Sequence, residues 1–76
     1  MSRYFFDLIG QRRSVYDYRG RCLPALDSAR SLAELMALDL AMNVEDEWLG
    51  WTVDVRDVEG SSLFSVTVKS FDLAAA

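Results

Sequence analysis

The chain has 76 residues, 51% hydrophobic and 26% charged, a balance typical of one small globular domain and not of a disordered tail. Without histidine and with Cys22 as the single cysteine, the composition excludes histidine-based metal clusters and an internal disulfide. A domain this small buries only about 60% of its unfolded surface, so association with another chain is the remaining route to extra stability.

We expect a cytoplasmic protein that binds no cofactor or metal. No apolar run approaches the length of a membrane span, and the charged N-terminal residues do not resemble an export signal. The net charge is −4, with six arginines against three acids in residues 1–30 and two basic residues against nine acids in residues 31–76. Nucleic-acid binding is therefore disfavoured.

The N-terminal segment predicts a β-hairpin. Residues 3–9, "RYFFDLI", are rich in aromatic residues and predict a strand with Tyr4, Phe6 and Leu8 on one face. Residues 14–18 predict a second, shorter strand.

Phe5 then lies on the opposite face of the predicted sheet. Tyr16 or Tyr18 is expected across the hairpin from it. Such a pair is either an ordinary cross-strand contact of a solvated face or a second contact surface.

Two D-x-x-G segments predict turns. Asp17–Gly20 and Asp57–Gly60 each place Asp first and Gly fourth, where the carboxylate accepts from turn amides and glycine tolerates positive φ. The second turn lies between alternating segments, 51–57 and 62–70, which predict a hairpin.

A single helix is predicted between the hairpins, over residues 25–46, with Pro24 at its entry. The predicted fold is α+β, in the order β-β-α-β-β. One helix packs on one face of a four-stranded antiparallel sheet, in strand order 2-1-3-4 or 1-2-4-3. The predicted core stripe of the helix is Leu26, Ala29, Ala33, Met36, Leu40 and Val44.

The helix also carries apolar residues that the sheet cannot bury. Leu35, Leu38 and Met42 form a second stripe on the far side. Either residues 45–50 or the C-terminal "FDLAAA" fold over this stripe, or it marks a homodimer or partner contact. We expect a self-associating interaction protein.

The sequence contains no motif typical of an enzyme active site, so we do not expect an enzyme. No nucleophile and base pair or glycine-rich phosphate loop is present, and acids such as Asp54 with Asp57, or Glu45 to Glu47, are typical of solvated faces. Cys22, beside Leu23, is expected to be a small buried hydrophobic residue.

The alternative prediction is an anion-binding or acidic-partner-binding module. Arg12 and Arg13 lie in the first hairpin loop, whereas Arg19 and Arg21 flank the first D-x-x-G turn. A strand of about five residues separates the two pairs by roughly 15 to 20 Å, which weakens the case for a single anion pocket.

The chain resembles a DUF6894-like family of short proteins of unknown function, abundant in rhizobia and related alphaproteobacteria. The likeness rests on "SRYFFDL", "YDYRGRCLPALDSARSLA" and "VDVRDVEGSSLFSVTV". It implies the same fold and a bacterial cytoplasmic setting, and adds no ligand residues.

Ala25 replaces the aspartate that in this family usually follows the proline, so a shifted or weaker helix cap is expected. The D-x-x-G-x-x-L-P order is also similar to antitoxins of the HicB type, a further alternative. The matching positions are Arg3 to Leu8, Asp17, Gly20, Leu23, Pro24, Ala29, Val53, Val55, Asp57 and Gly60.

Overall fold

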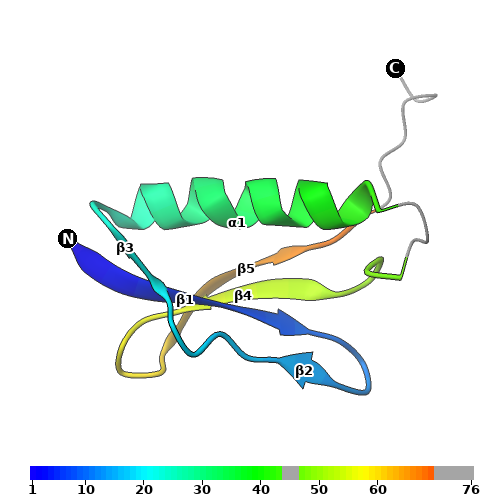
Figure 1. The fold of residues 1–76 in the computed structure, drawn as a ribbon, viewed down its shortest axis with the longest axis horizontal. Helices are drawn as coiled ribbons and strands as arrows, with labels where there is room; N and C mark the ends of the chain where they lie inside the picture. The colour runs from blue at the N-terminus through cyan, green and yellow to red at the C-terminus, as the bar shows by residue number, and fades with distance from the viewer. Residues whose placement is uncertain (44–46, 70–76) are drawn as a thin grey trace.

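The computed structural model describes residues 1–43 and 47–69. Within these residues, a helix covers one face of an antiparallel sheet, which confirms the predicted α+β fold (Figure 1). The elements are β1 (Ser2–Ile9), β2 (Ser14–Val15), β3 (Arg21–Leu23), α1 (Leu26–Ala41), β4 (Thr52–Arg56) and β5 (Ser62–Thr67).

The sheet order is β2-β1-β4-β5, which corresponds to the first of the two predicted orders. The structure adds β3, a three-residue strand that the sequence analysis missed, and β3 also pairs with β1. Because β2 pairs with the end of β1 and β3 with its start, the two are halves of one edge strand. The interruption covers residues 16–20, so the predicted strand over 14–18 is reduced to two residues.

Alternation along the strands places the apolar core between the sheet and α1. Phe6 lies opposite Val55 on β4, and Val55 lies opposite Phe64 on β5, so these side chains share the face that α1 covers. Trp48 and Trp51 pack at one end of this core with their rings edge to face. The buried apolar residues of the described chain are Tyr4, Phe6, Ala29, Ala33, Ala37, Ala41, Val53, Val55 and Val68.

Helix α1 is shorter than the predicted range of 25–46 and is rotated relative to the predicted core stripe. Its four buried residues are alanines spaced four apart, which lets the helix backbone approach the sheet closely. Met36 and Leu40, which were predicted to lie in the core, contact it but are only partly buried. The placement of Leu26 in the core was wrong, because at the first helical residue it is 41% exposed. Val44 lies outside the described residues.

The helix is offset from the centre of the sheet. Its main contacts are with β4 and β5, and it also touches β3. The side of α1 nearer β2 is therefore left partly uncovered. This offset creates the groove described below.

Candidate functional site

The interruption of the edge strand is held in place by Asp17. Its carboxylate accepts from the backbone N–H of Phe6 at 3.2 Å, in the place where a neighbouring strand would offer a carbonyl. The same carboxylate accepts from the N–H groups of Arg19 and Gly20, both at 3.0 Å, as predicted for this turn. One side chain thus satisfies three backbone donors where the ladder is broken.

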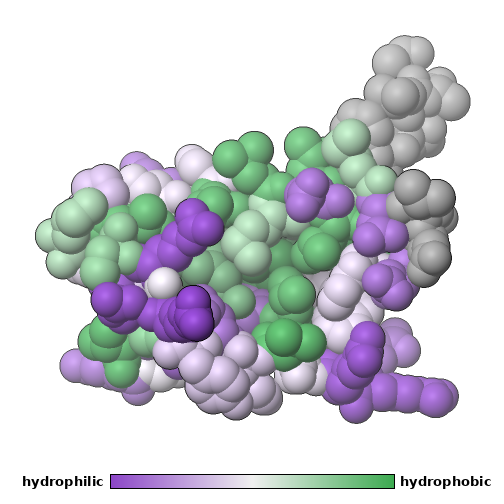
Figure 2. Space-filling model, in the orientation of Figure 1, coloured by the Kyte–Doolittle hydropathy of each residue, from purple (hydrophilic) through white to green (hydrophobic). Residues whose placement is uncertain are grey.

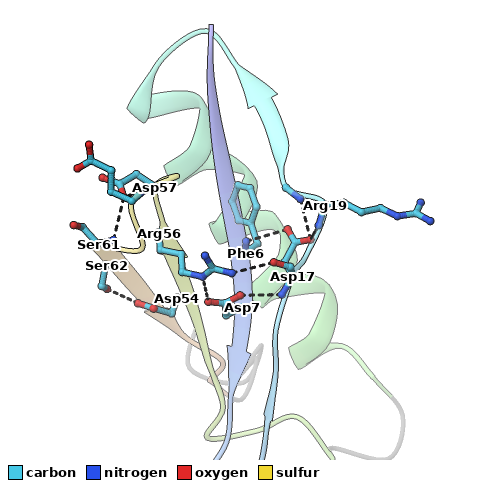
Figure 3. A network of polar contacts seen from close by, with 11 residues as sticks. Phe6, Asp7, Asp17, Arg19, Asp54, Arg56, Asp57, Ser61 and Ser62 are labelled. Carbon is cyan, nitrogen blue, oxygen red and sulfur yellow. Dashed lines mark hydrogen bonds and ion pairs between the residues drawn. The ribbon is translucent and has the colours of Figure 1, made fainter.

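Asp7 and Arg56 join the interruption to the centre of the sheet (Figure 3). Arg56 Nε donates to Asp7 Oδ2 at 2.6 Å, and Asp7 is only 2% exposed although it lies on the face away from the helix. The other Asp7 oxygen accepts from the backbone N–H of Asp17 at 2.9 Å, while an Arg56 NH2 group donates to the Asp17 carbonyl at 3.0 Å. The buried carboxylate therefore has both oxygens bonded, which offsets its desolvation.

This arrangement shifts two pKa values. Partial burial would raise the pKa of Asp17, but the hydrogen bonds from Gly20, Phe6 and Arg19 and the charge of Arg56 outweigh it, and the pKa lies below its ordinary value of 3.8. The hydrogen bond to Asp7 raises the pKa of Arg56 further. Both groups stay charged near neutral pH. Their hydrogen bonds hold the interruption of the edge strand against the centre of the sheet.

Gly20 allows the interruption to lie close to β1. Its φ is +69°, and a Cβ there would lie 2.8 Å from the carbonyl oxygen of Tyr4. The chain at this point turns its larger side chains outwards: Tyr18 is 86% exposed, and Arg19 points away from the polar cluster (Figure 3). Exposed tyrosine and arginine are the residue types enriched in contact hot spots.

A groove of about 470 Å³ lies between α1 and the interrupted edge strand. Its apolar walls come from Leu32 and Met36 on the helix and from Val15 on β2, and Arg21 lies on its rim. We call this hollow the edge groove. Its lining consists of Phe6, Leu8, Val15, Tyr16, Asp17, Arg19, Gly20, Arg21, Leu32 and Met36.

The predicted second stripe is exposed on the side of α1 that faces away from the sheet. Leu35, Leu38 and Met42 are 62%, 41% and 65% exposed. We call these three residues the outer face of α1. In residues 47–50, Trp48 and Leu49 pack against the core instead. The C-terminal segment "FDLAAA", named above as a possible cover, lies outside the described residues.

The four candidate anion-binding arginines line two different hollows. Arg19 and Arg21 line the edge groove, whereas Arg12 and Arg13 lie beside Trp51 at the β1–β2 turn. The guanidinium carbon of Arg13 lies 5.4 Å from the centre of the Trp51 ring. The predicted separation into two pairs agrees with this placement, and a role in anion binding stays a prediction.

Two other residues differ from expectation. Cys22 was expected to be buried, and this was wrong, because its side chain is exposed. Cys22 lies on β3, opposite the exposed Arg3 of β1, on the face of the sheet away from α1. Phe5 faces away from the helix, as predicted. The guanidinium carbon of Arg56 lies 4.6 Å from the centre of the Phe5 ring. Within the described residues, the Phe5 ring makes no contact with the ring of Tyr16 or Tyr18. A contact surface at Phe5 stays a prediction.

Within residues 1–43 and 47–69, the remaining carboxylates have structural partners or are exposed to solvent. Asp57 accepts from the N–H groups of Glu59 and Ser61, as predicted for the second turn, and Gly60 has a φ of +87°. Asp54 accepts from the Ser62 hydroxyl at 2.6 Å. Residues 1–43 and 47–69 contain no cluster of three potential metal ligands. Of the predicted acidic group Glu45 to Glu47, only Glu47 lies in the described residues, and it is exposed.

Sequence reasoning missed the Asp7–Arg56 pair and the edge groove. Asp7 and Arg56 are 49 positions apart, so only the register between β1 and β4 brings them together. The available signal was Asp7 within the apolar run of β1, together with the basic residue Arg56 in β4. The groove depends on the offset of α1, for which the sequence holds no local signal.

No helix in the described part of the chain is long and apolar enough to cross a membrane. The chain has no match among curated proteins or among solved structures. The family model for a domain of unknown function, DUF6894, matches residues 3–69, which include both polar turns, the edge groove and the outer face of α1. The chain therefore belongs to the DUF6894 family.

Proposed function

We propose that this chain is a non-enzymatic interaction protein of the bacterial cytoplasm that associates with a second copy of itself through the outer face of α1. One observation carries the proposal. The residues that the helix buries fully against the sheet are all alanines, and its leucines and methionine that touch the core are only half-buried. Three further large apolar residues, Leu35, Leu38 and Met42, are exposed. A helix that served only its own sheet would place leucine inwards, since burying a leucine is worth about 2 kcal/mol more than leaving it exposed.

The small core supports the same conclusion. The described residues bury nine apolar side chains, four of which are alanines. A chain of this size gains stability when a partner covers a contiguous apolar patch. Closed two-fold dimers are the commonest way in which one chain provides such a partner.

Substitution of Leu38 with glutamate tests this function. We expect the wild-type protein to sediment as a dimer at micromolar concentration and Leu38→Glu to sediment as a monomer, because a charge would be buried without a partner. Val58→Glu places the same charge on an exposed apolar residue of the turn between β4 and β5, away from the outer face; it is the control and should remain a dimer. If Leu38→Glu lowers the melting temperature without a change in mass, the outer face is covered by the chain itself and the proposal fails.

Anion binding by Arg19 and Arg21 is the second candidate. The observation in its favour is that both line an apolar groove and that neither side chain has an acidic partner within the described residues. A thermal-shift screen with phosphate, nucleotides and acidic metabolites tests it. A shift that disappears in Arg19→Ala/Arg21→Ala and persists in Arg12→Ala/Arg13→Ala would support this function, and no shift would remove it.

A further inference from the structure

The edge groove and the outer face of α1 form one continuous apolar surface. Leu32 and Met36 line the groove, and Leu35 on the outer face follows Leu32 by three positions, so the two side chains are neighbours on the helix. Figure 2 shows apolar side chains gathered along α1 and between α1 and β2 on the viewed face. The surface therefore combines a ridge with an adjacent hollow.

This surface has opposite charges at its two ends. Arg21 lies opposite Tyr4 in the sheet, and because Tyr4 faces the helix, Arg21 does so too. It lies on β3, which leads into the N-terminal end of α1 (Figure 1). Asp39 is exposed in the C-terminal half of α1, four positions after Leu35 and three after Met36. Neither charge takes part in an ion pair within the described residues.

We propose that two copies meet by a two-fold axis with their α1 helices antiparallel, so that the outer face of each covers the edge groove of the other. This inference rests on the proposed function and adds its geometry. Antiparallel helices bring Arg21 of each copy to Asp39 of its partner, twice in one contact. Parallel helices would instead place like charges side by side and align the helix dipoles unfavourably.

A second copy fits this groove because of its chemistry. The lining of the groove is mainly apolar and includes Arg19 and Arg21, while its one carboxylate, Asp17, is already bonded to backbone N–H groups. Such a groove is complementary to an apolar ridge with acidic flanks. The outer face of α1 has Glu34 on one side and Asp39 on the other. A standard interface takes about 800 Å² from each partner, a minor part of the 5462 Å² surface of this chain.

Exchange of the two charges tests this geometry. Arg21→Glu alone and Asp39→Arg alone each place like charges together at both ends of the contact, and each should weaken the homodimer about tenfold. In a 1:1 mixture of these two variants, the heterodimer has two attractive pairs. Native mass spectrometry of the mixture should therefore show the heterodimer well above its statistical half. Arg12→Glu mixed with Glu59→Arg, two charges outside the proposed contact, is the control and should give a statistical mixture.

The other possible results distinguish between failure of the antiparallel arrangement and failure of self-association itself. A statistical mixture of the Arg21 and Asp39 variants, with a wild-type dimer that Leu38→Glu dissociates, would leave the proposed function intact and refute the antiparallel arrangement. Assemblies of more than two chains, in which the two variants alternate, would refute the two-fold axis, because a two-fold contact closes at two chains. A wild-type protein that stays monomeric at high micromolar concentration would refute the proposed function and this inference together.

Discussion

Asp17 replaces part of a strand with one side chain. It accepts from three backbone donors, so the edge strand can be interrupted without leaving a donor of β1 unpaired. The interruption exposes Tyr18 and opens the rim of the edge groove. The surface proposed for association thus depends on a polar contact beside it.

The lowered pKa of Asp17 predicts an acid-dependent loss of stability. A carboxyl group with a folded pKa below its unfolded value contributes stability that is present above about pH 3.8 and is lost as the pH falls through the folded pKa. We expect Asp17→Asn to be less stable than the wild type at pH 6 and to lose less stability on acidification. Urea unfolding between pH 6 and pH 2.5 measures this. Parallel pH profiles for the two proteins would contradict the role assigned to Asp17.

The glycines of the two D-x-x-G turns, both at positive φ, predict unequal costs of substitution. Gly60→Ala meets no atom within 4 Å and should cost only the backbone term, about 1 kcal/mol. Gly20→Ala has the same backbone term and also a contact of 2.8 Å with a backbone oxygen of Tyr4. We therefore expect Gly20→Ala to be the more destabilising in urea unfolding. Equal free energies of unfolding would show that β1 and the interruption do not approach as closely as described.

At the residue scale, local features were predictable and distant ones were not. The Asp and Gly roles in both turns follow from four consecutive residues, and the structure confirms them. The Asp7–Arg56 pair requires the β1–β4 register, which no local pattern specifies. The exposure of Cys22 depends on its place in an edge strand too short to predict.

At the element scale, α1 begins without a side-chain cap. Ala25 is in extended conformation at the N-cap position, and its side chain makes no hydrogen bond to the first turn. The sequence predicted this weakness from the alanine at that position. The helix is held instead by its alanine stripe against β4 and β5.

Restoring a capping side chain should stabilise the helix. The carboxylate of an aspartate at this position can accept from a backbone N–H of the first turn, and its negative charge is favourable at the positive end of the helix dipole. We expect Ala25→Asp to raise the free energy of unfolding by about 1 kcal/mol. Thermal and urea unfolding measure this, with Pro24→Asp as a control that lies outside the cap. An unchanged or lower stability would contradict the cap geometry.

The periodicity of α1 predicted its existence but not its rotation. Ala29 and Ala33 of the expected core stripe are buried as predicted, but the structure continues the buried stripe with Ala37 and Ala41 in place of Met36 and Leu40. A pattern with apolar residues on most sides does not specify which side meets the sheet. The exposed stripe of Leu35, Leu38 and Met42 was nevertheless predicted, since it lies opposite either choice.

At the scale of the whole molecule, the offset of α1 links the fold to the proposed association. The helix lies over β4 and β5, and the space left beside β2 becomes the edge groove. The α+β architecture was predictable from alternation and turn chemistry, which also limited the strand order to two candidates, and the structure has the first of them. The offset was not, because it follows from the close approach of the alanine stripe.

Sedimentation equilibrium of the wild-type protein from 1 to 200 μM measures the proposed self-association. We expect a monomer–dimer equilibrium with the mass of two chains at the upper end, since the outer face of α1 and the edge groove are then mutually covered. A single species with the mass of one chain, 8.6 kDa, across the whole range would contradict it.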